Sequence, residues 1–187
     1  MRRKDRAMSR EFGLNVIDNS RYGVVSVAGK GKAPYSLPLS IVRDGDFLFF
    51  HSAKDGKKVE LLKKDMDVSV VFVGETHIPE NFSKDELDDM SKDESKGVQF
   101  ISKVFTTEFE SAIVVGKVKQ VEDRDEKIQA LKLICEKYTP SKMNYFPIAI
   151  KSGLDKTNIY SIHIEELTAK RKKYDLNHEE MKWERME

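Results

Sequence analysis

The feature of this sequence that most constrains its fold is a pair of strand-like runs separated by Asp44-Gly45. In residues 35–42 apolar and polar side chains alternate, which is the pattern of a strand with one buried face. Residues 47–50 are apolar on both faces and predict a central strand. Because glycine accepts the positive backbone φ that a two-residue hairpin turn needs, the two runs predict an antiparallel hairpin.

Four other runs are rich in β-branched and aromatic residues, which favours strands. Pro38 cannot donate a ladder hydrogen bond, so its strand is expected at a sheet edge or at a bulge. Hairpin connections dominate the first part of the chain. We therefore predict a mainly β fold with flanking helices, built on a six-stranded antiparallel or mixed barrel. The six predicted strands are 22–27, 35–42, 47–50, 68–73, 111–121 and 158–165.

A first helix is predicted after Phe50, where the sequence pattern changes from strand to helix. Val59, Leu62 and Met66 would share one apolar face of it, with lysines around that face. Either Ser52 or Asp55 could cap its start, because their side-chain oxygens accept hydrogen bonds from free backbone N–H groups.

A second helix is predicted to follow Asp123 and to end before Pro140. Asp123 followed by Glu126 resembles a capping box, and Pro140 stops the helix. The predicted apolar stripe consists of Ile128, Leu131, Cys135 and Tyr138. Cys135 is therefore interpreted as a core residue rather than a nucleophile.

The charge balance excludes several classes of partner. The chain has 33 Lys and Arg against 32 Asp and Glu, so no global field attracts nucleic acid or an anionic membrane. No apolar run approaches the length of a signal or membrane segment, and one cysteine allows no internal disulfide. No histidine has metal-ligand spacing to a cysteine or carboxylate, so no metal site is expected. We expect one cytoplasmic domain over 1–187, with a charged excursion at about 80–97 and a charged tail from about 170.

The junction between Phe50 and Lys58 is the best candidate for binding an anion. A helix start presents free N–H groups and the positive end of the helix dipole, which together favour a phosphate. Gly56 permits close backbone approach, and Lys57 and Lys58 add positive charge. An ordinary capped helix with solvated lysines explains the same pattern equally well.

An ordered set of short motifs supports the anion-binding interpretation. With it, the chain resembles the FMN-binding split-barrel superfamily that includes pyridoxamine 5′-phosphate oxidase, and within it the 5-nitroimidazole-resistance (Nim-like) branch. The motifs run in order through most of the chain. They are the basic start 1–6, Tyr22-Gly23-Val24, Tyr35–Ser40, Phe50–Ala53 with Gly56 and Lys58, Phe105–Ser111 with Gly116-Lys117, Glu126-Lys127 with Ala130-Leu131, and Lys156-Thr157.

The resemblance implies a split β-barrel homodimer with two FMN sites at the subunit interface. It further implies reduction of a small nitroaromatic substrate, with His51 as the catalytic residue. A non-catalytic flavin-binding or redox-sensing protein and a haem-binding split barrel remain open as alternatives. The implied cofactor-binding residues are the backbone of Leu37, Pro38 and Leu39 beside the flavin ring, His51 and Ser52 near the ribityl chain or reactive face, and Lys57, Lys58 and Ser111 at the phosphate.

Two segments depart from the family pattern. The chain lacks the Trp- and Arg-rich end of true pyridoxamine phosphate oxidases and ends instead in Lys170–Lys173 and a tail with Trp183, which argues against vitamin B6 oxidation. The charged excursion is longer than expected for the Nim-like branch. It would either cover the flavin pocket or form solvated surface.

Overall fold

The structure is a computed structural model that describes residues 2–28, 33–62 and 66–182. The sequence also predicts a turn at Gly29-Lys30-Gly31 and basic charge from Lys63 and Lys64 around the first helix, but these residues and Trp183 lie outside the described part of the chain. No helix in the described part of the chain is both long enough and apolar enough to cross a membrane.

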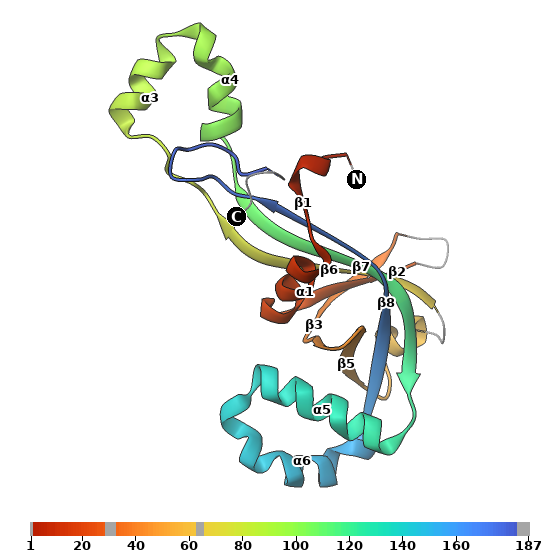
Figure 1. The fold of residues 1–187 in the computed structure, drawn as a ribbon. Helices are drawn as coiled ribbons and strands as arrows, with labels where there is room; N and C mark the ends of the chain where they lie inside the picture. The colour runs from red at the N-terminus through yellow and green to blue at the C-terminus, as the bar shows by residue number, and fades with distance from the viewer. Residues whose placement is uncertain (1, 29–32, 63–65, 183–187) are drawn as a thin grey trace.

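The strands form one sheet in the order β3-β2-β6-β7-β8-β5-β4, with β1 paired to β8. Every pairing is antiparallel. The sheet curls into a split β-barrel with flanking helices (Figure 1), as the sequence predicts. The strands are β1 Ala7–Met8, β2 Gly23–Val27, β3 Tyr35–Leu39, β4 Val42–Asp44, β5 Phe47–Ala53, β6 Met66–His77, β7 Glu108–Val121 and β8 Thr157–Lys172.

The described chain therefore has eight strands, and the prediction of six was wrong. The predicted run 35–42 ends as β3 at Leu39, and its last residue, Val42, belongs to β4 at the opposite edge of the sheet. Residues 40–41, with the Ile41 side chain fully buried in the core, therefore connect the two edges. The other additional strand is β1, which is too short to have a recognisable pattern. Pro38 lies in edge strand β3, as predicted.

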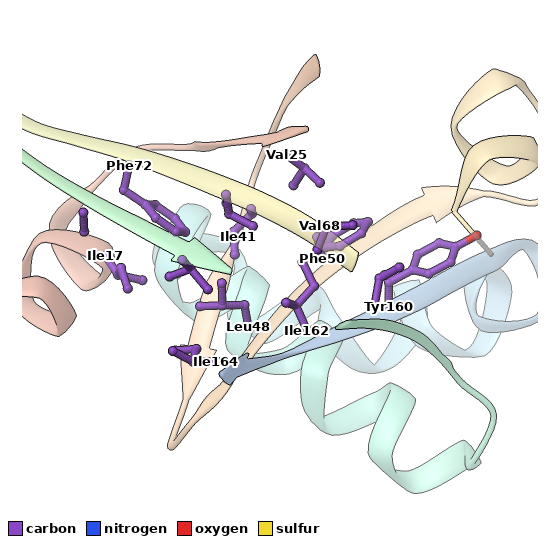
Figure 2. Packing of buried hydrophobic residues seen from close by; sticks show 14 of the residues in the cluster. Ile17, Val25, Ile41, Leu48, Phe50, Val68, Phe72, Tyr160, Ile162 and Ile164 are labelled. Atoms are coloured by element: carbon purple, nitrogen blue, oxygen red, sulfur yellow. The ribbon is translucent and has the colours of Figure 1, made fainter. Parts of the chain in front are cut away.

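The hairpin between β4 and β5 is confirmed. Asp44 pairs with Phe47, and Gly45 adopts a φ of 55°, a conformation that glycine reaches without strain. The barrel core lies on the inner face of the sheet and includes Leu48, Phe50 and Tyr160 (Figure 2). The rings of Phe50 and Tyr160 stack, with their centroids 5.2 Å apart.

The helices are α1 Arg10–Asn19, α2 Lys57–Leu61, α3 Lys84–Ser91, α4 Gly97–Gln99, α5 Arg124–Tyr138 and α6 Phe146–Gly153. Helix α1 contributes Val16 and Ile17 to the barrel core. Helix α5 packs against the outer face of β4, β5 and β8 through Ala130 and Ile134.

Helix α5 begins as predicted, because the side chain of Asp123 accepts a hydrogen bond from the Glu126 N–H at 2.8 Å. Of the predicted stripe, Leu131 and Tyr138 pack partly buried against the sheet. Ala130 and Ile134 are the buried residues, and Cys135 is only half-buried.

The two central strands β6 and β7 extend beyond the barrel and carry residues 78–107, here called the arm (Figure 1). The arm contains α3, α4 and a π-helical turn at Phe100–Val104. The segment after β8 is hydrogen-bonded to the arm and to the start of β7. The Tyr174 hydroxyl donates to the Ser102 carbonyl, and the Tyr174 N–H donates to the Glu108 carboxylate at 2.7 Å. The predicted polar tail from residue 170 is thus structured here, and β8 runs to Lys172 instead of ending at Glu165.

Candidate functional site

Helix α2 lies beside the first residue of edge strand β3. The ammonium group of Lys57 stands 4.3 Å from the centre of the Tyr35 ring, a cation–π contact. This contact brings the predicted phosphate-binding lysines next to the strand predicted to run beside a flavin. Tyr35 was not predicted to have a role, although its position at the start of the alternating run gave a signal for one.

Lys58 and His51 lie close enough to interact electrostatically. The pKa of His51 lies below its ordinary value of 6.5, because neighbouring atoms desolvate the ring and because the charge of Lys58 disfavours the imidazolium form. Burial also lowers the pKa of Lys58. At neutral pH, His51 is therefore mainly uncharged, while Lys58 holds a partly desolvated positive charge.

Helix α2 is shorter than predicted and has no side-chain cap. It ends at Leu61, so Met66 belongs to β6, and neither Ser52 nor Asp55 caps its start. The residue before the helix is Gly56, at a φ of 101°, and no described atom lies within 4 Å of where its Cβ would stand. A five-residue helix has a weak dipole, so an anion here depends mainly on the two lysine side chains.

Strand β3 offers backbone groups to a ligand. Its one partner strand in the described sheet is β2, so it is an edge strand. The backbone N–H and C=O groups along the free edge can bind a planar heterocycle that has donors and acceptors on its rim. The side chains of Leu37 and Leu39 pack against the barrel core, whereas Pro38 is exposed on the outer face.

Ser52 faces the opposite side of the sheet from His51, because successive residues of a strand alternate in direction. Ser52 is buried, and its hydroxyl donates to the carbonyl of Ala53 at 2.7 Å. Asn158 donates to the same carbonyl at 3.2 Å. The structure therefore brings His51, but not the Ser52 side chain, to the outer face.

Ser111 lies far from the other predicted site residues within one chain. His51 pairs with Ile159, which pairs with Val121 on β7. Ser111 is ten residues from Val121 along that strand, or about 33 Å for an extended chain. Within one chain, Ser111 is therefore not next to His51.

The outer face at the middle of the sheet carries exposed apolar side chains that sequence reasoning did not single out. Strand β7 has Ile113 and Val115 there, and β6 has Val73. The sequence contains a signal for them, since the successive residues 112–115 are all apolar and so give apolar side chains on both faces of the strand. A sheet face that exposes several large aliphatic side chains is typical of a protein interface.

The arm does not cover the candidate site of its own chain. Helix α2 precedes the Met66 end of β6, whereas the arm follows the His77 end. The strand between them has 12 residues and is therefore about 36 Å long. Among the described residues, no group of histidine, cysteine and carboxylate side chains could hold a metal ion.

The model of the pyridoxamine 5′-phosphate oxidase family matches residues 9–171 of the chain. A search of curated proteins gives no match. One similar solved structure is a protein from Bacteroides thetaiotaomicron proposed to be a 5-nitroimidazole antibiotic resistance protein. It has a TM-score of 0.64 and 20% identity, with 88% of this chain and 86% of that chain covered.

Two further solved structures have the same fold. A flavocytochrome from Azotobacter vinelandii has a TM-score of 0.65 and 17% identity, covering 91% of this chain and 72% of that chain. An FAD- and haem-binding protein from Mycobacterium smegmatis has a TM-score of 0.65 and 16% identity, covering 89% of this chain and 73% of that chain. At identities of 20% and below, the likeness shows the fold alone.

Proposed function

Because this chain belongs to the pyridoxamine 5′-phosphate oxidase family, we propose that it binds FMN and acts as a flavin-dependent oxidoreductase. The observation that carries the proposal is the convergence of Lys57, Lys58 and His51 with the free edge of β3. The two lysine cations match the phosphate of FMN, and the uncharged imidazole matches the reactive face of the flavin ring. The backbone donors and acceptors of β3 match the polar rim of that ring.

The residues present fit this cofactor. Lys58 would bind the phosphate through its partly desolvated ammonium group, which makes a stronger charge-assisted hydrogen bond than a fully solvated one. Lys57, held over Tyr35, would add a second positive charge. The open space beside Gly56 leaves room for phosphate oxygens. Flavin, when bound, supplies the electrons for reduction of a substrate.

His51 would orient a substrate above the reactive face. Because its lowered pKa keeps the ring neutral, it can donate one hydrogen bond and accept another at physiological pH. A neutral imidazole orients well but is a weaker acid than imidazolium, so protonation of a reduced product by His51 becomes efficient only at lower pH.

We propose a homodimer with the flavin sites at the interface. Ile113, Val115 and Val73 form the exposed apolar centre of one sheet face, and a second copy is the partner that would cover it symmetrically. Such a dimer would also bring Ser111 of the second copy toward the phosphate. The proposed substrate class is a small nitroaromatic such as a 5-nitroimidazole.

Absorption spectroscopy tests the cofactor directly. We expect the purified protein to be yellow, or to take up FMN on titration with one FMN per chain. A protein that stays colourless with FMN and instead gives a Soret band with haem would overturn the proposal. Turnover is tested by nitro-compound reduction under anaerobic conditions with a chemical reductant, comparing wild type with His51→Ala and, as matched control, His163→Ala on the neighbouring strand.

A second candidate function is flavin binding without turnover, as a redox sensor or carrier. The observation that favours it is the lowered pKa of His51, which leaves the site without a strong acid at neutral pH. Equal nitro-reduction rates for wild type and His51→Ala, no higher than that of free FMN, would support this second candidate over the first.

A further inference from the structure

The molecule leaves two helical faces without a partner, at opposite ends of β7. The first lies on the arm and consists of Val98 in α4, Ile101 in the π-helical turn and Phe105 directly after that turn. Their exposed fractions are 74%, 75% and 80%. Large apolar side chains rarely remain this exposed together unless a partner covers them.

The second unpartnered face belongs to α6. None of its residues is buried, although its sequence is mostly apolar. Ile148 on α6 is 68% exposed, and Tyr145, the residue directly before α6, is 69% exposed. Figure 1 shows the arm and α6 at opposite ends of the molecule, so the two faces cannot meet within one chain.

The two segments that carry these faces have net charges of opposite sign. The arm, residues 78–107, has seven acidic residues against four basic ones. Four of the acids, Asp85, Glu86, Asp88 and Asp89, are exposed on α3. The segment 140–156, which contains α6, has three lysines against one aspartate. Attraction between the two segments would fix which surface of a second copy the arm meets.

Strand β7 supplies the geometry. The arm precedes Glu108 at one end of the strand, and α5 and α6 follow Val121 at the other. The exposed apolar side chains of Ile113 and Val115 lie near its middle. A two-fold axis near Ile113 and Val115 would make the β7 strands of the two copies run in opposite directions. It would therefore place the arm of each copy beside α6 of its partner.

We propose that the arm of each subunit docks on α6 of a second copy of this chain, through the apolar face formed by Val98, Ile101 and Phe105. The contact occurs twice in the dimer, once at each end. The inference rests on the homodimer proposed above and adds which elements of the two subunits contact each other.

Cross-linking tests the contact in the full-length protein. The background is Cys135→Ala, which removes the native thiol. Ile101→Cys and Ile148→Cys are made separately, and a short bis-maleimide linker is added to each variant and to their mixture after subunit exchange. We expect covalent dimers from the mixture and almost none from either variant alone, because the arm meets α6 and not another arm. Val98→Cys with Tyr145→Cys provides a second pair at exposed positions.

Dimer affinity gives an independent measurement. Ile101→Ser with Phe105→Ser should raise the dimer dissociation constant by at least about tenfold, since each side chain loses an apolar contact. Leu176→Ser, at a residue that is also exposed but lies outside the arm, is the matched control and should leave the dissociation constant unchanged.

Two cross-linking results overturn the inference. One is an equal yield of covalent dimer from the single variants and from their mixture, and the other is no covalent dimer from either cysteine pair.

Flavin titration of the wild-type protein separates the two proposals. Flavin binding without arm-to-α6 linking leaves the proposed function intact and removes the inference. Linking without flavin binding removes the proposed function and retains the inference.

Discussion

Replacing Lys58 with alanine isolates the charge on which the proposed phosphate site depends. Lys58 stands at the start of α2, partly buried, with a lowered pKa caused by desolvation. Its charge also acts on His51, so the variant changes both the phosphate site and the imidazole. Lys54→Ala is the control, because Lys54 is an exposed lysine in the preceding turn.

The expected loss follows from the exposure of the side chain. A hydrogen bond to a charged group contributes about 1.5–3 kcal/mol. Because Lys58 is only partly buried, solvent screens its charge, and the lower part of that range, about 1.5–2 kcal/mol, applies. This corresponds to a roughly 12- to 30-fold weaker affinity for FMN. Lys54→Ala should change the affinity by less than about twofold.

Fluorescence titration with FMN and with riboflavin is the decisive assay. Riboflavin has the same ring and ribityl chain but no phosphate. Lys58→Ala should therefore weaken FMN binding and leave riboflavin binding nearly unchanged. The loss of FMN affinity caused by Lys58→Ala, measured relative to the loss for riboflavin, should become smaller as the salt concentration is raised, since screening reduces the contribution of a partly exposed charge.

Two results would refute the reasoning. Equal losses for FMN and riboflavin would show that Lys58 supports the fold of the pocket and does not bind the phosphate. An unchanged FMN affinity at low salt would show that the phosphate lies elsewhere.

Three further perturbations follow from the structure. Gly116→Ala should destabilise the fold by at least about 3 kcal/mol in urea unfolding, because the new Cβ would stand 1.9 Å from the carbonyl oxygen of His163. Gly153→Ala, where no atom lies within 4 Å, should stay within about 1 kcal/mol, and equal effects would contradict the assigned packing of β7 on β8. Asp123→Ala should cost about 1 kcal/mol in thermal unfolding through loss of the α5 cap, and an unchanged midpoint would argue against that cap. The folded-state pKa of His51 lies below 6.5, so the unfolded chain binds more protons in acid and stability should fall as pH drops through 6.5. His51→Gln should reduce this slope in unfolding curves measured above and below that pH, and an identical slope would place the titration elsewhere.

Local patterns in the sequence were sufficient for several elements. The alternation in 35–42, the turn at Asp44-Gly45 and the cap at Asp123 each depend on residues within a few positions of one another. The same holds for the edge position of Pro38, since the missing N–H is a property of that residue. The barrel class, the β4–β5 hairpin and the start of α5 were predictable for this reason.

The candidate site was predicted less completely. Lys57, Lys58 and His51 are close in sequence and remain close in the structure. Ser52 was grouped with His51 by proximity, although the two-residue period of a strand turns its side chain to the other face. Ser111 was grouped with them by resemblance, but pairing along β7 places it at the far end of the sheet.

The sequence by itself determined six segments that form strands, where the tight turn lies and which lysines follow a strand end. Only the tertiary structure decided that Val42 leaves the predicted run for the opposite edge of the sheet, that β5 pairs with β8, and that the arm and α6 lie at opposite ends of β7. The physical reason is range. Backbone preference and side-chain periodicity act over a few residues, whereas strand partners and barrel closure depend on burying apolar surface from segments more than a hundred residues apart.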